Sequence, residues 1–316
     1  MDWLKRADVL MTVLSGSRAR GMDVTQEDVD KGLATKVSDW DFRSVYVFRH
    51  RDEWRLDENA PEQFTGKIDP KYEPAEHDMF HLRKFMRLVY KPSPEHVEML
   101  WSDVVMQDHI PMMHKGSMLR ALRYKFSSKD LVRRYVKAAG EVTSEAVNEH
   151  KLLSDAEFEK GVGRSHLLGR AIHYRTEDPQ ESWKAIADVL RRLYVAQQLL
   201  LDKTNSLQAI DESKAALSHL GYWLEAASRL NVKLPDDGYV VYNEKDGLLR
   251  LRPEPVVLEY LRNVRFGRVG WLDALEYRND LYDQVELLLQ TSKLRDEADP
   301  VWGDIFLQYV ALTTNV

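Results

Sequence analysis

Gly16 and Ser17 have the residue types and the spacing needed to hold a phosphate group. They come shortly after an apolar run, Val9–Leu14, whose composition predicts a β-strand. Glycine permits a tight turn that brings the backbone close to a ligand. Ser17 offers a hydroxyl and an amide at the start of a helix, where free N–H groups and the helix dipole attract anions. The sequence therefore indicates a phosphate-binding turn between a strand and a helix.

A pair of carboxylates, Asp39 and Asp41, opens a second β-favouring run. Alternate residues of a strand share a face, so we expect these two side chains on one face and Trp40 on the other. In proteins Mg²⁺ is held by one or two carboxylates together with phosphate oxygens and water. Separately, a Gly-Ser turn and an Asp-x-Asp pair are common surface features. In this order, on a strand–turn–helix–strand frame, they predict a divalent-cation site beside a phosphate site.

The elements that must position these motifs divide the chain into two regions. Residues 1 to about 80 contain short β-favouring runs separated by polar loops, whereas helical spacing dominates afterwards. We predict an α+β fold, with a sheet domain at 1–90 and a helical domain at 91–316. A β-hairpin or an extended connector is expected near 236–252. The expected helices include 80–90, one opened by Ser93-Pro94, one capped by Ser128, and 182–201, 211–230, 254–264 and 270–290.

The composition excludes several classes of protein. The 316 residues include no cysteine, which excludes disulfide scaffolds, thiolate nucleophiles and thiolate metal sites. The formal net charge is −6, so binding to nucleic acid requires a local basic face. No apolar run is long enough to span a membrane. We expect a soluble, cytoplasmic protein without a membrane partner, and the sequence predicts no particular oligomeric state.

The most basic local segment is 120–137, where cations are interleaved with aromatic residues. Such a face can follow an RNA backbone and stack bases, although an ordinary helix with aromatic residues in the core has the same pattern. The candidate RNA-binding residues are Arg120, Arg123, Lys125, Lys129, Arg133, Arg134 and Lys137. A smaller second group consists of Arg262, Arg265 and Arg268.

The amino-acid sequences of several segments resemble those of a known family. The segments GSRARG, SDWDFRSVYV, HLRKFMRLVYKPSPEHVEMLW and FSSKDLVRRYVKAAG are similar to the predicted nucleotidyltransferases linked to RNA repair, within the DNA polymerase β superfamily. The similarity is strongest over 13–47 and 80–101. It implies an enzyme that uses Mg²⁺ or Mn²⁺ to transfer a nucleoside monophosphate from an NTP to a hydroxyl group. The implied acceptor is an RNA end, such as that of a damaged tRNA.

The resemblance also implies roles for particular residues. The Gly-Ser turn would hold the triphosphate, and Asp39, Asp41 and a third carboxylate would hold two metal ions. The family places that third carboxylate at position 76, which is Glu76 in this sequence, and Glu76 would then also act as general base. Asp78 shares the strand face of Glu76 and is the second choice, with N-cap of the following helix as its alternative role.

Four further residues are candidate nucleotide contacts. Arg18 follows the Gly-Ser turn, and Arg43 shares the strand face of the acidic pair, but each could instead form an ion pair. Lys214 and His219 are similar to a lysine and a histidine that related enzymes present toward the nucleotide, with a solvated helix face as the alternative. The acidic segment 26–30 lengthens a loop beyond what the resemblance implies, and we expect it to be a solvated surface loop.

Three functions stay open at this point. The first is nucleotidyl transfer to RNA, and the second is the same transfer to a protein or a small molecule, as in toxin-like or antibiotic-modifying enzymes. The third is a degenerate nucleotide- or RNA-binding protein, for which the only support is Glu76 in place of the expected aspartate. The presence of both Asp39 and Asp41 argues against this third function.

Overall fold

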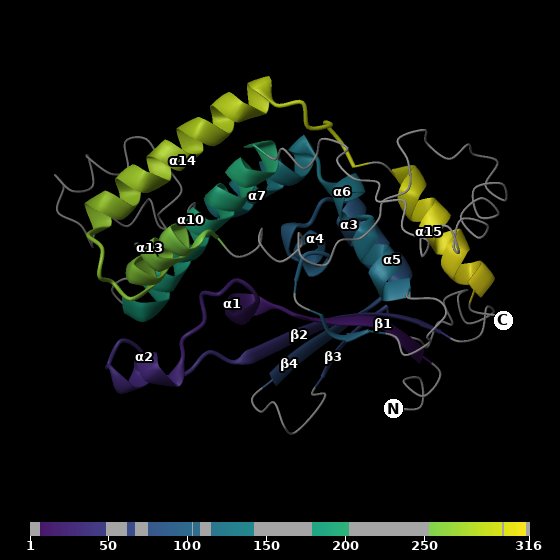
Figure 1. The fold of residues 1–316 in the computed structure, drawn as a ribbon, viewed down its shortest axis with the longest axis horizontal. Coiled ribbons are helices and arrows are strands. Elements are labelled where there is room, and N and C mark those ends of the chain that lie inside the picture. Colours follow the sequence, from purple (N-terminus) through teal and green to yellow (C-terminus); the bar gives the residue numbers. More distant parts are fainter. Residues whose placement is uncertain are drawn as a thin grey trace.

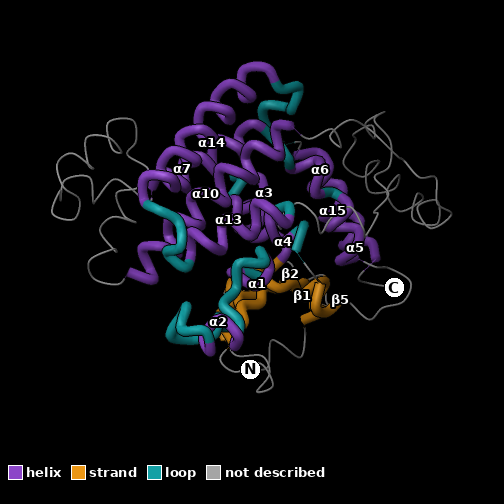
Figure 2. The backbone as a smooth tube through the Cα atoms, turned by 60° about the vertical axis from the view of Figure 1, so that its left-hand side comes forward, coloured by secondary structure: helices purple, strands orange, loops and turns teal. Residues whose placement is uncertain are grey.

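The computed structural model describes residues 7–48, 62–66, 75–102, 104–107, 115–141, 179–201, 253–298 and 300–313. A small sheet lies beneath a layer of helices, and the long helices gather on one side of it (Figures 1 and 2). This arrangement confirms the α+β fold class.

Within the described residues, five strands form the sheet in the order β3-β4-β2-β1-β5. β1 is antiparallel to β2 and to β5, and β3 is antiparallel to β4, whereas β2 and β4 run parallel. Because β5 comes from beyond residue 90, the sheet is not confined to the predicted 1–90 segment. The strands are β1 (Ala7–Leu14), β2 (Trp40–Phe48), β3 (Gln63–Gly66), β4 (Ala75–His81) and β5 (Val104–Gln107).

The helices of the described residues follow the predicted pattern over most of their length. The expected helices at 182–201, 254–264 and 270–290 correspond to α10, α13 and α14, while 211–230 and the connector at 236–252 lie outside the described residues. The helices are α1 (Gly16–Ala19), α2 (Gln26–Asp30), α3 (Leu82–Tyr90), α4 (Pro94–Met99), α5 (Lys115–Ala121), α6 (Arg123–Phe126), α7 (Lys129–Glu141), α10 (Pro179–Leu201), α13 (Pro255–Arg265), α14 (Trp271–Thr291) and α15 (Pro300–Thr313). None of them has the length and apolar character that crossing a membrane requires.

One buried cluster attaches the sheet to the helices, and a second one holds the segment after α1 against them. The larger one joins residues of β1 and β2, such as Leu10 and Val45, to Phe85 of α3 and Phe306 of α15. The smaller one lies among α7, α10, α13 and α14 and includes Met22, three residues after the end of α1. Burial of apolar surface stabilises such contacts by about 25 cal/mol per Å². The segment after the Gly-Ser turn is therefore held by the C-terminal helices as well as by the sheet.

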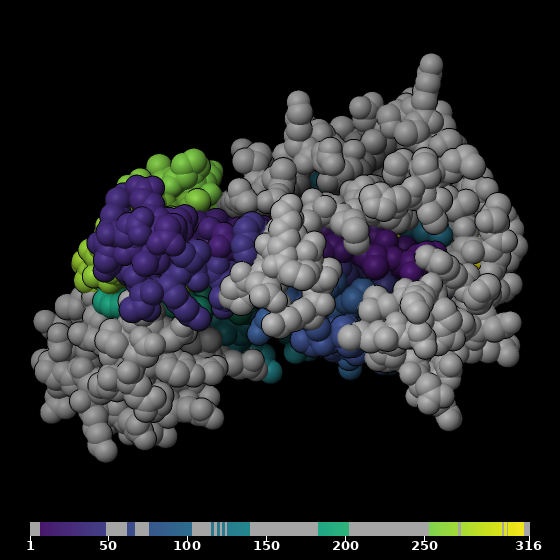
Figure 3. All heavy atoms as spheres, turned by 90° about the horizontal axis from the view of Figure 1, so that it is seen from below, coloured from purple at the N-terminus to yellow at the C-terminus, as the bar shows by residue number. Residues whose placement is uncertain are grey.

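The acidic segment 26–30 is a short helix, α2, so the prediction of a solvated loop is wrong. Thr25 and Asp28 form a capping box, in which each side chain accepts a hydrogen bond from the backbone N–H of the other. Asp28 is buried and accepts a hydrogen bond of 2.7 Å from Arg262 of α13. In Figure 3 the purple segment that contains α2 lies against the green C-terminal helices.

These contacts also change the pKa of Asp28 and the role of Arg262. Burial alone would raise the pKa of Asp28, but hydrogen bonds from Thr25 and Arg262 outweigh it and lower this pKa. Arg262 donates a second hydrogen bond of 2.7 Å to the carbonyl of Asp23. Arg262 therefore anchors the α1–α2 connection, and the prediction that it belongs to a nucleic-acid patch is not supported by its contacts.

Two histidines of β4 are buried in the sheet and are neutral. His77 Nε2 lies 2.6 Å from the hydroxyl of Ser44, which in turn lies 2.7 Å from that of Thr12. His81 stacks on Phe48. Burial lowers the pKa of each histidine to about 4, from 6.5 in an exposed site.

We expect the free energy of unfolding to decrease as the pH falls from about 6.5 to about 4. In this range the unfolded chain binds protons that the folded histidines do not, and each histidine contributes up to about 1.4 kcal/mol per pH unit. Urea unfolding at several pH values measures this slope. His77→Gln keeps a partner for Ser44 and should flatten the slope, and a slope that does not change would show that His77 is not neutral in the fold.

Candidate active site

A cleft of about 240 Å³ opens where β2 and β4 begin and β1 ends. Its walls come from the turn between β1 and α1, from β2 and β4, and from α4. Five carboxylates and two arginines line it, the arginines being Arg20 and Arg43. The carboxylates are Asp41, Glu76, Asp78, Glu95 and Glu98.

Asp41 and Glu76 lie opposite each other on the paired parallel strands. Burial raises the pKa of Asp41, and the nearby carboxylates of Glu76 and Asp39 raise it further. Among the described residues neither Asp41 nor Glu76 forms an ion pair, whereas Asp78, Glu95 and Glu98 each do. The two acids therefore concentrate negative charge that a bound cation would neutralise.

Gly16 brings the turn into contact with Asp41. Its φ is +64°, and a Cβ at this position would lie 1.9 Å from Asp41 Oδ2. The backbone N–H of Ser15 also donates a hydrogen bond of 2.8 Å to the carbonyl of Asp41. Any other residue at position 16 would both strain the backbone and displace the carboxylate, so the turn and the acid form one unit.

The residues beside Gly16 take different positions from those predicted. Ser15 and Gly16 line the cleft, but Ser17 does not. Arg18 lies away from the cleft, where it donates to the carbonyls of Ser38 and Asp39 and stacks over a ring at 4.2 Å. The ring belongs to Trp40, so Arg18 supports the loop that leads to the acidic pair.

Asp39 stands at the edge of this arrangement. Its side chain is 46% exposed, does not line the cleft, and lies 3.8 Å from Lys36 Nζ. Within the described ranges no three acidic or histidine side chains form a preassembled metal site. The predicted trio of Asp39, Asp41 and Glu76 is thus present as one close pair with the third member nearby.

Asp78 and Arg43 form a structural pair on the same face as the acids. Asp78 lies opposite Arg43 in the register, with their charged groups 3.8 Å apart, and accepts a hydrogen bond of 2.7 Å from Thr65. Arg43 also pairs with Glu95 at 3.1 Å. Asp78 is not the N-cap of α3, because that residue is His81, whose side chain accepts from Arg83 N–H.

The predicted basic face of residues 120–137 forms only in its second half, on α7. Arg120, Arg123 and Lys125 are only 2%, 1% and 5% exposed, because α5 and α6 turn these side chains inward. Lys129 lies 3.8 Å from Asp296, and Arg133 pairs with Asp130 at 2.6 Å. Arg133, Arg134 and Lys137 of α7 remain exposed. Lys214 and His219 lie outside the described residues.

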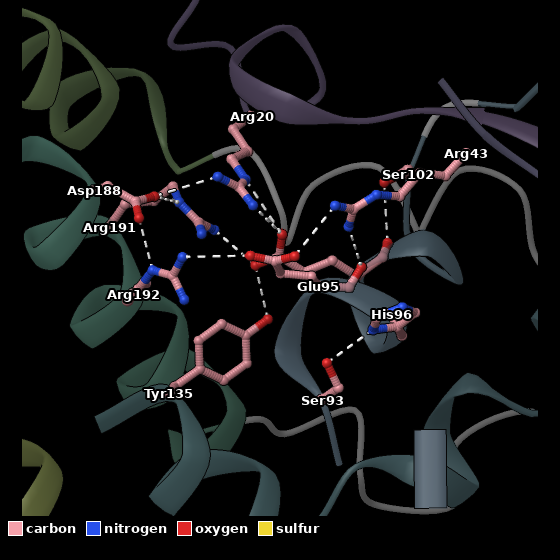
Figure 4. A network of polar contacts seen from close by, with 11 residues as sticks. Arg20, Arg43, Ser93, Glu95, His96, Ser102, Tyr135, Asp188, Arg191 and Arg192 are labelled. Atoms are coloured by element: carbon pink, nitrogen blue, oxygen red, sulfur yellow. Dashed lines mark hydrogen bonds and ion pairs between the residues drawn. The ribbon is translucent and has the colours of Figure 1, made fainter. Parts of the chain in front are cut away.

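Sequence reasoning missed Arg20, which enters the cleft from the end of α1. Its guanidinium is held by Glu98 of α4 and Asp188 of α10 (Figure 4). The motif GSRARG contains two arginines close to the predicted phosphate-binding turn, so both were possible phosphate contacts. Only the fold shows that the second one, Arg20, lines the cleft.

A model of RlaP, described as the RNA repair pathway DNA polymerase beta family, matches residues 2–218. The chain belongs to this family. Among solved structures, a nucleotidyltransferase-like protein from Exiguobacterium sibiricum 255-15 is similar, with 11% identity and a TM-score of 0.26. That similarity covers 90% of this chain and 69% of the other. No curated protein matches this chain. The resemblance that the sequence motifs carry is confirmed by the family match.

Replacing Gly16 by alanine should destabilise the protein more than replacing Gly32. Both glycines have positive φ, of +64° and +70°, but a Cβ at Gly32 meets no atom within 4 Å. Gly32→Ala therefore measures backbone strain alone, about 1–2 kcal/mol. Gly16→Ala adds the collision with Asp41. Urea unfolding of both variants gives the comparison, and equal losses would contradict the contact between the turn and Asp41.

Proposed function

We propose that this member of the RNA repair pathway DNA polymerase beta family is a Mg²⁺-dependent nucleotidyltransferase. It moves a nucleoside monophosphate from an NTP to a hydroxyl group at an RNA end. The observation that carries the proposal is the pairing of Asp41 with Glu76 in a cleft, in contact with the Gly16 turn and beside Arg20.

The residues present suit Mg²⁺. The ion prefers oxygen ligands and usually takes one or two carboxylates, with phosphate oxygens and water completing the shell. Asp41 and Glu76 supply two such carboxylates, and burial together with the charges of Glu76 and Asp39 raises the pKa of Asp41. Asp39 lies close enough to contribute to that pKa and is a further proposed ligand. When bound, Mg²⁺ polarises the phosphate and makes a coordinated hydroxyl more acidic.

The side chains of the cleft would then position the two substrates. Arg20 would bind the non-transferred phosphates, since a guanidinium donates several hydrogen bonds to phosphate oxygens. Glu76 would accept the proton of the acceptor hydroxyl. The acceptor oxygen bonds to the α-phosphorus as the bond from that phosphorus to the bridging oxygen of the leaving group breaks, and pyrophosphate leaves. Positioning and charge stabilisation supply most of the acceleration.

Asp41→Asn and Glu76→Gln should each lower transfer from an α-labelled NTP by roughly 100-fold or more. Asp78→Asn should have a smaller effect, because Asp78 pairs with Arg43 and Thr65. Asp30→Asn, on the exposed face of α2, is the matched control and should be fully active. Removal of divalent cations should stop the reaction, and added Mg²⁺ should restore it. Full transfer by Asp41→Asn would rule out this mechanism.

Label from the NTP should appear on RNA when the protein is incubated with mixed RNA, proteins and small hydroxyl compounds. The exposed cations of α7 are candidate backbone contacts, so Arg134→Ala with Lys137→Ala should raise the KM for RNA roughly 3- to 10-fold and leave the KM for NTP unchanged. Label on protein or on a small molecule would instead support the second acceptor class. NTP binding without transfer to any acceptor would indicate a nucleotide-binding protein.

A further inference from the structure

We propose that Glu98 is a positioning residue, which holds Arg20 toward the phosphates of the bound nucleotide with the help of α10. The inference rests on the proposed function and deepens it. It adds to the site a buried acid of α4 and charged residues of the helical region that do not themselves touch the substrate.

Three nitrogens of the Arg20 guanidinium contact carboxylates from two different helices. Nε and Nη2 donate to Glu98 Oε2 at 3.2 and 3.0 Å, and Nη1 donates to Asp188 Oδ1 at 3.3 Å. A guanidinium has five N–H groups in a rigid plane, so these contacts fix its orientation and leave donors for a ligand. The Arg20 side chain is 17% exposed and lines the cleft.

Glu98 is itself kept ionised in a buried position. Its side chain is 7% exposed. Its second oxygen, Oε1, accepts hydrogen bonds of 2.9 Å from Arg191 and 2.9 Å from Tyr135. Burial would raise the pKa of Glu98, but Arg191, Arg20 and Tyr135 together lower this pKa to about 2. Glu98 therefore carries a full negative charge toward Arg20 at any physiological pH.

The charged partners of Arg20 form a network with two further arginines of α10. Asp188 also accepts from Arg191 at 3.2 Å and from Arg192 at 2.7 Å. Three guanidiniums thus share the carboxylates of Glu98 and Asp188, and Arg192 also lies 3.9 Å from Glu95, so the charges of the network are matched. Figure 4 shows Arg20, which follows α1, meeting Asp188, Arg191 and Arg192 of α10, with Tyr135 of α7 nearby. Among the three arginines, Arg20 is the one that lines the cleft, together with Glu98, so its remaining N–H groups can reach an anion there.

Stability alone is a weak reason for such an arrangement. Removing two charges from water is costly, and a buried ion pair is often no more stabilising than apolar side chains of similar volume. The positioning role instead predicts a specific kinetic effect. An Arg20 that is no longer held would bind the non-reacting phosphates less well, which raises the KM for NTP more than it lowers kcat.

Glu98→Gln tests this role, with Tyr135→Phe as its matched control. Both variants alter the hydrogen bonding of the same carboxylate, but Tyr135 contacts Oε1 whereas Arg20 contacts Oε2. We expect Glu98→Gln to raise the KM for NTP roughly 10-fold or more with a smaller change in kcat. Tyr135→Phe should lower thermal stability without changing this KM. An unchanged KM in a folded Glu98→Gln variant would overturn the inference.

The same substitution in an Arg20→Ala background decides whether Glu98 acts through Arg20. If it does, Glu98→Gln should cause no further rise in KM once Arg20 is absent, and additive effects would overturn the inference. If Glu98→Gln does not fold, Asp188→Asn takes its place in both backgrounds, with an expected rise in KM of roughly 3-fold. Wild-type protein that neither binds nor turns over any NTP would overturn the proposed function as well, whereas transfer with these KM values unchanged would overturn the inference alone.

Discussion

The register between β2 and β4 is the constraint on which the site depends. These strands run parallel, and the pairing of Asp41 with Glu76 places both acids on one face at the beginning of their strands. A shift by a single residue would turn Glu76 to the other face and bring His77 into the cleft. The buried contact of His77 with Ser44 on that other face opposes such a shift. Packing on one face of the sheet therefore fixes the positions of Asp41 and Glu76 on the other face.

The cleft separates its charges into two groups that serve different purposes. Three of its carboxylates are neutralised by arginines, with Glu98 paired to Arg20 and both Asp78 and Glu95 paired to Arg43. The remaining two acids meet beside Gly16 without such a partner among the described residues. Because a charge arrangement that exists before the substrate binds needs no reorganisation during the reaction, this separation favours a cation at the acids and an anion at Arg20.

Local sequence signals predicted the parts of the site that are close together in the chain. The strand, the turn at Gly16 and the second strand follow directly from apolar runs and one glycine. The same kind of signal was present for α2, since Thr25 and Asp28 have the spacing of a capping box, but the surrounding acids suggested a solvated loop. Glu76 was placed through the resemblance, because nothing local reveals which residue of a later strand faces Asp41.

Contacts over long distances in sequence could not be predicted in this way. Arg18 and Arg20 look alike in the motif, and what distinguishes them is that Arg20 reaches Glu98 and Asp188, 78 and 168 residues further along. For the basic segment 120–137, the sequence predicted exposed side chains that the fold in part buries. Cations at helical spacing indicate a charged face only if the helix continues, whereas here α5 and α6 are short and direct Arg120 and Arg123 inward. Charge in a sequence does not by itself indicate exposure.

The helical region therefore contributes to the site as well as covering it. Three contacts hold the segment after Gly16: Arg20 is fixed by α4 and α10, Met22 packs among α10, α13 and α14, and Asp28 is paired with Arg262. The acids depend mainly on the sheet, but the position of the segment that carries Arg20 depends on helices that lie up to 239 residues away in the chain. A change that displaced α10 would leave Asp41 opposite Glu76 and still move Arg20. The proposed metal ligands and the proposed phosphate-binding arginine are thus stabilised by different parts of the fold.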